Sequence, residues 1–358
     1  MASNVFFHPV NDPAEIHEVQ NAVTTLWEAA DAGSRICTQD LVAVKIHVGE
    51  LANNTHLLPE HVAPVVTLIK QSGGLPFLAE TSTIYKGERD NAVRHILHAN
   101  ANGFSIEKTG APFISLDGLV GNSEIEVTIP GKIFERVLVA RDAVTCDGLV
   151  AISHPTGHLC AGLGACLKNL GMGLASRTGK LRQHSTVEPL LKSSKCTFCR
   201  KCEKWCPEHA IIPDTESKSI TILKDKCVGC GECISLCRFG ALNFDWNKDS
   251  GTIQKAMAEH ALGAITGKMD KTVFINILIN MTPECDCMGM SQKKVLPDKG
   301  VLLSFDPVAI DAATLALATD EASLNLSKLS HPDLDPMVQL EHAAAIGMGT
   351  TDFRLIQI

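Results

Sequence analysis

The sequence lacks the features that would place the protein in a membrane or on nucleic acid. No segment approaches the roughly 18 apolar residues of a membrane-spanning helix, and Met1–Val10 does not have the pattern of a secretory signal. Lys and Arg number 32 against 40 Asp and Glu, a net charge of −8. This deficit argues against a nucleic-acid partner, because phosphate contacts need a surplus of basic side chains. We expect a cytoplasmic protein with no membrane span and no nucleic-acid partner.

Cysteine, by contrast, is abundant. The 358-residue chain has 14 cysteines, and eight of them lie within residues 196–237. A chain of this length does not depend on disulfides for stability, so the close spacing predicts metal binding. Thiolates that bind iron must be protected from oxygen, and we therefore expect a reducing, anaerobic setting.

The cysteine-rich segment contains an internal repeat. Lys195–Ile211 reads KCTFCRKCEKWCPEHAI, and Lys226–Leu242 reads KCVGCGECISLCRFGAL. In each C-x-x-C-x-x-C-x-x-x-C run, three cysteines can bind one cubane while the fourth points to the other cubane. The spacing therefore predicts a bacterial-type ferredoxin module that transfers low-potential electrons through two [4Fe–4S] clusters. The expected ligands are Cys196, Cys199, Cys202 and Cys237 for the first cluster, and Cys227, Cys230, Cys233 and Cys206 for the second.

Zinc is the main alternative for these cysteines. Zinc ribbons use two C-x-x-C pairs rather than four cysteines in each half, so the spacing favours iron. Pro207 follows the fourth cysteine as in bacterial ferredoxins, whereas Arg238 stands at that place in the second half. Residues 191–248 have ten Lys or Arg and seven Asp or Glu, which leaves the rest of the chain at −11. The basic module either docks on an acidic surface, its own or an electron-transfer partner's, or is simply solvated.

Strand and helix patterns alternate on both sides of the module. This alternation predicts an α/β fold, a mostly parallel sheet covered by helices, with an inserted α+β bacterial ferredoxin-like domain. We expect residues 1–190 plus 250–358 to form one discontinuous domain and residues 191–249 the inserted domain; three consecutive domains are the alternative. The expected strands are 41–48, 76–79, 147–153, 272–279 and 301–304, the expected helices 59–71, 88–101, 253–266, 309–318 and 337–346, and the expected hairpin 125–129 with 133–139.

The main candidate site follows the strand that ends near Ser153. Ligands in open α/β sheets bind beyond the carboxyl ends of the strands. His154 and His158 could hold a metal or pass protons, and Lys168 could hold an anionic small-molecule substrate. The glycine-rich run is neither a phosphate-binding loop nor a dinucleotide fingerprint, but its backbone could approach an anionic cofactor. Its candidate residues are Asn169, Gly171 and Gly173. The alternative is that the glycines permit close packing and the histidines are structural.

Two further segments should lie near this edge of the sheet. Lys45 and His47 alternate along a strand, so they share one face, and its carboxyl end meets the same rim. Cys285 and Cys287 follow another strand. A disulfide between residues i and i+2 is strained, so we expect a third metal site or free thiolates, with unremarkable buried cysteines as the alternative. Asp306 should cap a helix, and the dispersed cysteines Cys37, Cys146, Cys160 and Cys166 should be core thiols.

Together these segments resemble a family of uncharacterised iron–sulfur centre proteins, known as domain of unknown function 362. The resemblance covers nearly the whole chain and implies an α/β domain with a 2[4Fe–4S] module, but no settled activity. The matching stretches are KIHVGE (45–50), YKGERDNA (85–92), HPTGH through GACLKNLGMG (154–173), the ferredoxin repeat, Cys-Asp-Cys (285–287) and SFDPVAIDAA (304–313). The polar positions within them are Lys45, His47, His154, His158, Lys168, Asn169, Cys285, Asp286, Cys287, Asp306 and Asp311.

These features favour a reductase. Electrons would pass from the clusters to a substrate or metal centre at the rim of the α/β domain, with His154 or His158 supplying protons and Lys45 and Lys168 holding an anionic substrate. The partner would be an electron donor or acceptor protein. Two other functions remain open: a non-catalytic electron carrier or docking protein, and a maturation factor that transfers metal or cluster through Cys285 and Cys287.

Overall fold

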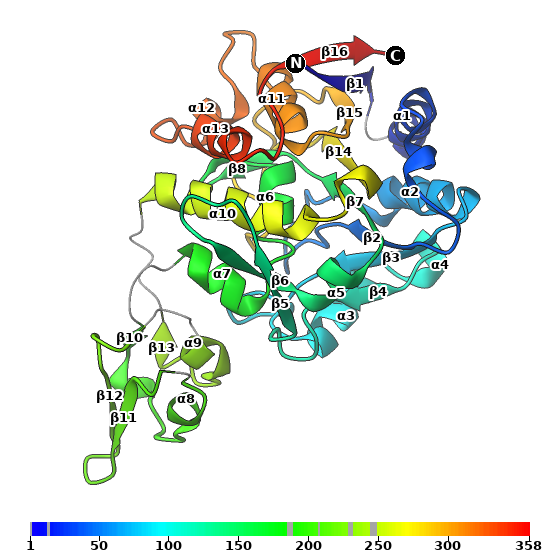
Figure 1. Cartoon of the computed structure of the whole chain (residues 1–358). Coiled ribbons are helices and arrows are strands. Elements are labelled where there is room, and N and C mark those ends of the chain that lie inside the picture. The colour runs from blue at the N-terminus through cyan, green and yellow to red at the C-terminus, as the bar shows by residue number, and fades with distance from the viewer. Residues whose placement is uncertain (1, 13–14, 185–188, 207, 228–231, 244–248) are drawn as a thin grey trace.

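The chain folds around one large twisted sheet (Figure 1). The computed structural model describes all of residues 1–358 except 1, 13–14, 185–188, 207, 228–231 and 244–248. The 8-stranded sheet has the order β16-β1-β15-β14-β7-β2-β3-β4. Only β15 runs antiparallel to its neighbours, so the predicted mostly parallel α/β fold is confirmed. The strands are β1 (Ser3–Pro9), β2 (Leu41–Lys45), β3 (Leu75–Glu80), β4 (Phe113–Ser115), β7 (Gly148–Ser153), β14 (Thr272–Leu278), β15 (Gly300–Ser304) and β16 (Phe353–Gln357).

Helices cover both faces of this sheet because successive strand residues point to opposite sides. Val42 and Val44 of β2 pack into one apolar core, together with α1 and α2. Ala43 points the other way, into a second core that contains α6, α10, α11 and α13. The strands at the centre are buried on both faces, as their near-continuous apolar sequences require. The helices are α1 (Ile16–Ala29), α2 (Pro59–Gln71), α6 (Cys166–Gly171), α10 (Ser250–Ile265), α11 (Pro307–Leu317) and α13 (Met337–Ala345).

Most predicted elements are present with small changes of boundary. The helix predicted at 59–71 is α2 itself, with Pro59 in its first turn. The helix predicted at 88–101 is shorter: α3 (Ala92–Ala101) begins after Asn91, whose side chain caps it by accepting the Arg94 N–H. The remaining elements of this part are η1 (Ala32–Arg35), α4 (Ile106–Thr109), α5 (Arg141–Thr145), β8 (Thr156–His158), β9 (Gly162–Gly164), α7 (Arg177–His184), η3 (Met269–Lys271) and α12 (Leu326–Ser330).

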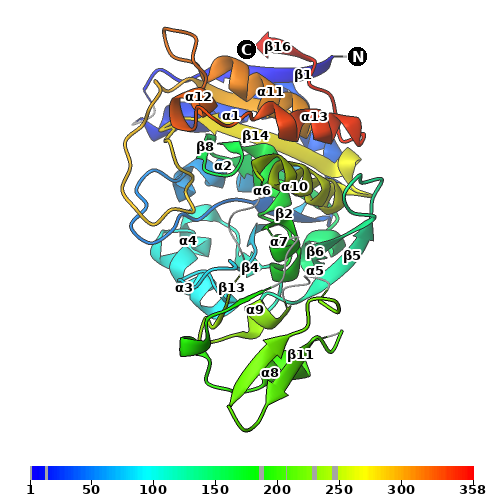
Figure 2. The ribbon, with the colours of Figure 1, turned by 90° about the vertical axis from the view of Figure 1, so that its left-hand side faces the viewer.

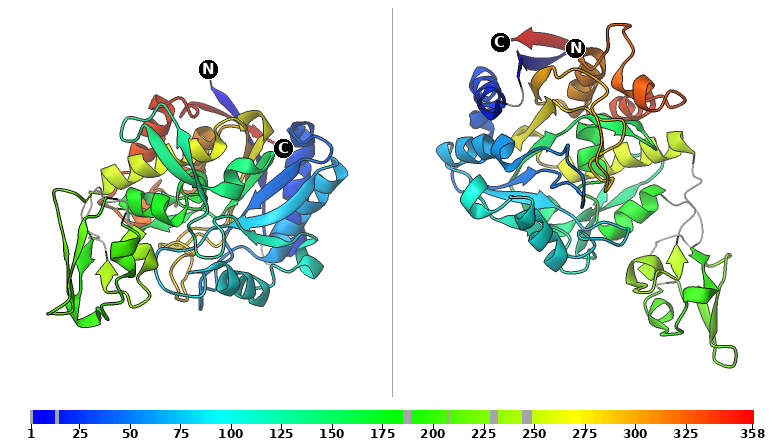
Figure 3. Two further views of the ribbon diagram at one scale, coloured as in Figure 1. Left: turned by 60° about the horizontal axis from the view of Figure 1, so that its bottom comes forward. Right: turned by 180° about the vertical axis from the view of Figure 1, so that it is seen from behind.

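The segments before and after the cysteine-rich region build the same sheet. β14, which follows that region, pairs with β7, which precedes it, and β15 pairs with β1. This pairing supports the proposal of a discontinuous domain made of residues 1–190 and 250–358. The described part of residues 190–243 forms a small separate lobe, seen from different directions in Figure 1, Figure 2 and Figure 3. Its elements are β10 (Leu190–Leu191), η2 (Ser193–Lys195), α8 (Lys201–Lys204), β11 (Ile211–Asp214), β12 (Ser219–Ile222), α9 (Glu232–Leu236) and β13 (Leu242–Asn243).

None of the helices in the described part of the chain combines the length and apolar character needed to cross a membrane.

Glu259 joins the later part of the chain to the predicted hairpin, which is β5 (Glu124–Thr128) paired with β6 (Arg136–Ala140). The carboxylate lies on α10, is fully buried, and contacts His342 Nε2 at 2.9 Å. It also accepts the backbone N–H groups of three successive residues in the hairpin turn: Lys132, Ile133 and Phe134.

We predict that Glu259→Ala lowers the free energy of unfolding by about 3 kcal/mol, because it leaves buried donors without an acceptor. Urea unfolding followed by circular dichroism measures this loss. Glu321→Ala removes an exposed carboxylate and should change the same quantity by less than about 0.5 kcal/mol. Equal effects of the two substitutions would contradict this role for Glu259.

Candidate functional site

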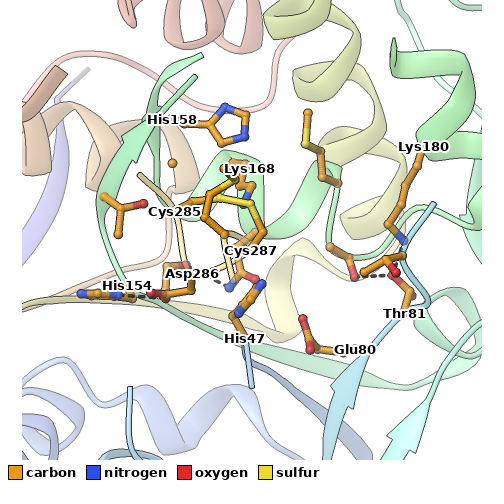
Figure 4. A pocket seen from close by; sticks show the side chains of 18 of the residues that line it. His47, Glu80, Thr81, His154, His158, Lys168, Lys180, Cys285, Asp286 and Cys287 are labelled. Carbon is orange, nitrogen blue, oxygen red and sulfur yellow. Dashed lines mark hydrogen bonds and ion pairs between the residues drawn. A yellow bond between two sulfur atoms is a disulfide. The ribbon is translucent and has the colours of Figure 1, made fainter. Parts of the chain in front are cut away.

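A pocket opens at the carboxyl ends of β2, β3, β7 and β14 (Figure 4). Lys45, Glu80 and Ser153 end three of these strands, and the Cys285–Cys287 loop follows the fourth. The parallel strands thus bring distant segments to one edge, as predicted. The residues anticipated from the sequence that line the pocket are Lys45, His47, His154, His158, Lys168, Asn169, Gly173, Cys285, Asp286 and Cys287.

A buried ion pair lies at the base of the pocket. Lys45 Nζ is 3.6 Å from Glu80 Oε1, and it donates a 2.7 Å hydrogen bond to Asn169 Oδ1. Burial lowers the pKa of Lys45 to about 8 although Glu80 opposes the shift. Burial acts to raise the pKa of Glu80, but nearby His47, Lys45 and Arg89 hold it well below its usual value. The pair is therefore charged at neutral pH.

Arg89 was not singled out from the sequence, although it organises one wall of the pocket. Its guanidinium donates to Glu50 Oε2 at 3.1 Å and to the Tyr85 hydroxyl at 2.7 Å. It also contacts His47 Nε2 at 3.1 Å, while the other ring nitrogen of His47 accepts the Gly49 N–H. Burial, with the charge of Arg89, places the pKa of His47 well below its usual value. His47 is therefore a neutral ring held in place by its neighbours.

Two further lysines face the pocket. Lys180 on α7 donates to Thr81 Oγ1 and Ala175 O, and burial lowers its pKa to about 7. Lys168 on α6 is half-buried, and burial lowers its pKa to about 8. Its ammonium donates no hydrogen bond to any residue that the structure describes. A cation in this state is suited to bind an anion.

The two histidines of the HPTGH motif have different environments. Both ring nitrogens of His154 face acceptors, Asp286 Oδ2 at 2.9 Å and Ile279 O at 2.7 Å. Burial opposes protonation of His154, but Asp286 outweighs it and raises the pKa. Burial and nearby Lys168 hold the pKa of His158 well below its usual value. His154 therefore holds Asp286 in place, and of the two rings it is His158 that has a nitrogen available to a ligand.

Asp286 leaves one acceptor unused. Its Oδ1 is buried and has no hydrogen-bond partner among the residues that the structure describes. Burial acts to raise the pKa of Asp286, but His154 outweighs it and lowers the pKa, so the carboxylate is ionised. A buried acceptor without a partner costs stability. The atom is therefore available to accept a hydrogen bond from a molecule in the pocket.

Cys285 and Cys287 are joined as a disulfide, which corrects our expectation of unpaired thiols (Figure 4). We rejected this pairing because of its short spacing, but the loop brings the two Cα atoms within 5.2 Å. Cys160 also lines the pocket and Cys37 is exposed, so these two are not core thiols. Cys146 is buried, as expected.

The glycine-rich run has a packing role at one of its two candidate positions. Gly171 does not line the pocket, and a Cβ there would lie 2.1 Å from Met257 O on α10. At Gly173 a Cβ would lie 2.7 Å from Lys45 Nζ, so this glycine leaves room for the lysine. Asp306 caps α11, as predicted. Asp311 accepts the N–H groups of the first two residues of α6.

The cysteines of the separate lobe gather in its small core. Cys233 packs there with cysteines of both repeats, Cys196, Cys202, Cys206 and Cys237. Burial raises the pKa of Cys202, and the neighbouring Cys199 and Cys237 raise it further. Cys237 belongs to the second repeat, so its closeness to Cys199 and Cys202 agrees with the exchanged ligand set. Cys230 and Pro207 lie outside the described residues.

The backbone of the lobe follows the repeat as well. Cys206 Sγ accepts the Ala210 N–H at 3.2 Å, and Cys237 Sγ accepts the Ala241 N–H at 3.3 Å. N–H···S bonds of this kind stabilise thiolates that bind iron–sulfur clusters.

Three residues of the first repeat have left-handed backbone. Phe198, Arg200 and His209 have φ of 51°, 57° and 47°. The residues 31 positions later are all glycine, Gly229, Gly231 and Gly240, and glycine adopts this conformation at least cost. Non-glycine residues that persist in this conformation indicate that the loop geometry is required. The gathered cysteines and this loop geometry are therefore compatible with iron–sulfur clusters in the lobe.

We predict that Lys168 loses its proton near pH 8, because burial disfavours the ammonium. An uncharged amine reacts with acetic anhydride, so labelling of Lys168 should rise with a midpoint about two pH units below that of ordinary lysines, near 10.4. Mass spectrometry after brief labelling between pH 6 and 11 measures this midpoint, and exposed lysines in the same digest give the reference. A common midpoint for all of them would contradict the assignment.

Comparison with known proteins identifies the family. The model of the family described as "Domain of unknown function (DUF362)" matches residues 42–316. Pyruvate synthase subunit PorD of Methanothermobacter marburgensis is 35% identical over 86 residues, which are 24% of this chain and 96% of that protein. The PorD subunit of Methanocaldococcus jannaschii is 34% identical over 80 residues, 22% of this chain and 88% of that protein.

Two other similarities are weaker. A selenate reductase subunit of Mesobacillus selenatarsenatis is 40% identical over 55 residues, 15% of this chain and 18% of that protein. The lactate racemase apoprotein of Thermoanaerobacterium thermosaccharolyticum has a TM-score of 0.44 at 11% identity, covering 88% of this chain and 58% of that chain. We draw no functional inference from that structure. The family match covers more than half of the chain, so the protein belongs to the DUF362 family.

Proposed function

We propose that the protein is an iron–sulfur reductase of the cytoplasm. Residues 191–249 would hold two [4Fe–4S] clusters, and the pocket at the sheet rim would bind a small anionic substrate that receives their electrons. The observation that carries this proposal is the half-buried Lys168, a cation in the pocket whose ammonium donates no hydrogen bond within the described residues. When bound, the clusters supply single electrons at low potential.

The charges around the pocket favour an anion. Lys45 and Glu80 largely compensate each other, as do His154 and Asp286. Lys168 remains as a cation on the pocket wall, and Lys180, whose pKa is lowered to about 7, is partly charged there. An anionic group could accept hydrogen bonds from Lys168, while a hydroxyl or protonated group of the same molecule could donate to the unused Asp286 Oδ1. These groups select a small molecule with both an anionic and a donor group.

His158 is the better candidate for proton transfer. His154 uses both ring nitrogens on protein acceptors, so it has no nitrogen free for a substrate. His158 has one long contact, the Cys160 N–H at 3.3 Å from its Nδ1. It lines the pocket beside Lys168. With its lowered pKa the His158 ring is neutral, so it could accept and relay a proton, while the Lys168 ammonium could donate one to a reduced substrate. This arrangement supports Lys168 as the proton donor, His158 as a proton relay and His154 as the residue that positions Asp286.

Helix α7 links the cluster module to the pocket. α9, which contains Cys233, contacts α7. Lys180 and His184 of α7 line the pocket. One short helix therefore lies between the helix that contains Cys233 and the proposed substrate site. Electron transfer within the chain needs such a short path.

One comparison favours a second function, that of an electron carrier. The PorD relatives are matched over nearly their whole length but over only a quarter of this chain. The matched segment thus corresponds to nearly a whole polypeptide that is a subunit of a larger enzyme and is too short to include this pocket's domain. Substitutions in the pocket distinguish a carrier from a reductase.

Paired cysteine substitutions test the cluster assignment. Protein purified without air is expected to hold about eight irons. Cys202→Ala/Cys237→Ala should retain about four, because both thiols belong to one cluster, whereas Cys202→Ala/Cys206→Ala should lose nearly all of them. Iron quantification with electron paramagnetic resonance of the reduced protein measures this. The opposite pattern would show that each repeat holds its own cluster, and Cys37→Ala is the control.

Lys168→Ala tests the reductase. The clusters are reduced without air, excess reductant is removed, and their reoxidation by a panel of small carboxylates and oxyanions is followed in the visible spectrum. We expect at least one anion to reoxidise the clusters, and Lys168→Ala to slow this reaction at least tenfold because the anion loses its charged partner. Lys168→Arg should retain more of the rate, and Lys132→Ala removes a lysine outside the pocket lining as the control.

The outcome separates the two functions. Reoxidation by an anion that is unchanged in Lys168→Ala, or no reoxidation by any anion, would contradict a reductase that uses this pocket. Rapid reoxidation by a partner protein in both the original protein and Lys168→Ala would then support the electron carrier.

A further inference from the structure

Two sulfurs and one imidazole meet in the pocket. A ring nitrogen of His158 and the Sγ atoms of Cys285 and Cys287 all lie within 4.8 Å of one another. His158 and Cys285 are buried, and Cys287 is half-buried. Figure 4 shows the three side chains in one cavity with Lys168. Such a set is dense in soft donors, which is the composition of a metal site.

The backbone holds the two loops together without help from the disulfide. The Gly157 N–H donates to Thr282 O at 2.8 Å, and a Cβ on Gly157 would lie 2.1 Å from Pro283 O. Any larger residue at 157 would therefore push β8, and His158 with it, away from the cysteine loop.

The cysteine loop itself is fixed from both sides. The Met288 N–H donates to Cys285 O at 2.9 Å, and Asp286 is held by His154. Residues around a metal site commonly orient its ligands in this way. The sulfurs should consequently remain near His158 after the disulfide is reduced.

We propose that Cys285 and Cys287, once reduced, bind one soft divalent cation such as Zn²⁺ together with His158, and that the disulfide closes this site. Two thiolates and one imidazole leave the fourth tetrahedral position open, which is the arrangement of a catalytic rather than a structural zinc site. The open position faces a pocket that also contains Lys168 and Cys160. A substrate oxygen could take this position while Lys168 holds its anionic group.

The chemical balance is simple. Reduction of the disulfide takes two electrons and two protons and gives two thiols. Binding of M²⁺ then releases the two protons and gives a neutral unit of one metal ion and two thiolates. Two clusters that each carry one electron could supply the two electrons. This source of electrons rests on the proposed function. The cation site itself does not rest on it, because any thiol reductant can reduce the disulfide.

One feature of His158 must change when the metal binds. Its Nδ1 accepts the Cys160 N–H at 3.3 Å, so the opposite nitrogen carries the proton in the oxidised state. A metal on that nitrogen would require the proton to move to Nδ1, and a metal on Nδ1 would replace the Cys160 contact. The contact is long and therefore weak, so neither change should prevent binding.

Zinc uptake by the full-length protein with its clusters intact tests the site. The protein is treated without air with a phosphine reductant, desalted, incubated with Zn²⁺ and freed of loosely bound metal with a weak chelator. We expect one additional zinc per chain, with unchanged iron, and about none without the reductant. Zinc K-edge absorption should show two sulfurs at about 2.3 Å and one nitrogen near 2.0–2.1 Å, a signal that the iron clusters do not disturb.

Matched variants assign the ligands. Cys285→Ser/Cys287→Ser should abolish the additional zinc, and His158→Gln should weaken its binding at least tenfold. Cys37→Ser removes an exposed thiol that precedes β2 and should bind as the original protein does. Circular dichroism and iron content verify that each variant is folded. Absence of zinc in the reduced protein, or its retention in the double serine variant, would overturn the proposal.

A second arm separates this inference from the proposed function. In this arm no phosphine is added. The clusters are reduced by light instead, and zinc uptake is measured again. Uptake in both arms supports the site and its opening by the clusters. Uptake with phosphine alone supports the site but contradicts electron delivery from the clusters to this pocket.

Discussion

The buried pair of Lys45 and Glu80 is the constraint on which the pocket depends. Each charge alone would cost several kcal/mol to bury, so each needs the other, and Lys45 also needs the Asn169 amide. Because Asn169 lies on α6, this requirement ties the end of β2 to the helix that carries Lys168. Gly173 belongs to the same arrangement, since any side chain there would displace the Lys45 ammonium. The position of the Lys168 cation is thus set by a pair whose own charges compensate each other.

The strand order explains why so much of the site could be anticipated. Buried apolar strands ending in polar residues predict which side chains meet at one rim, and Lys45, His47 and His158 all lie there. Arg89 could not be found in this way, because it lies in an irregular segment before α3 and its carboxylate partners become evident only in the folded chain. The disulfide was rejected from a general rule on spacing, whereas the actual loop conformation decides whether two sulfurs meet.

The cysteine repeat contains more structural information than its spacing alone. The left-handed residues Phe198, Arg200 and His209 each correspond to a glycine in the other half. From the sequence alone, those three glycines could be interpreted as a sign of a flexible loop. The first repeat adopts left-handed backbone at these positions at a conformational cost, and Gly240 shares that conformation with His209. A conformational cost retained in the first repeat indicates that the shape of its cysteine loop is required.

The point of insertion ties the module to the chemistry of the pocket. The cysteine-rich segment follows α7, whose own residues line the cavity, and the chain returns to begin α10, which packs on α6 and α7. The module is also positive while the remainder of the chain is at −11, so long-range attraction favours the lobe remaining near its own domain. Sequence position and charge therefore act in the same direction, and both favour electron delivery within the chain over exchange with a distant partner.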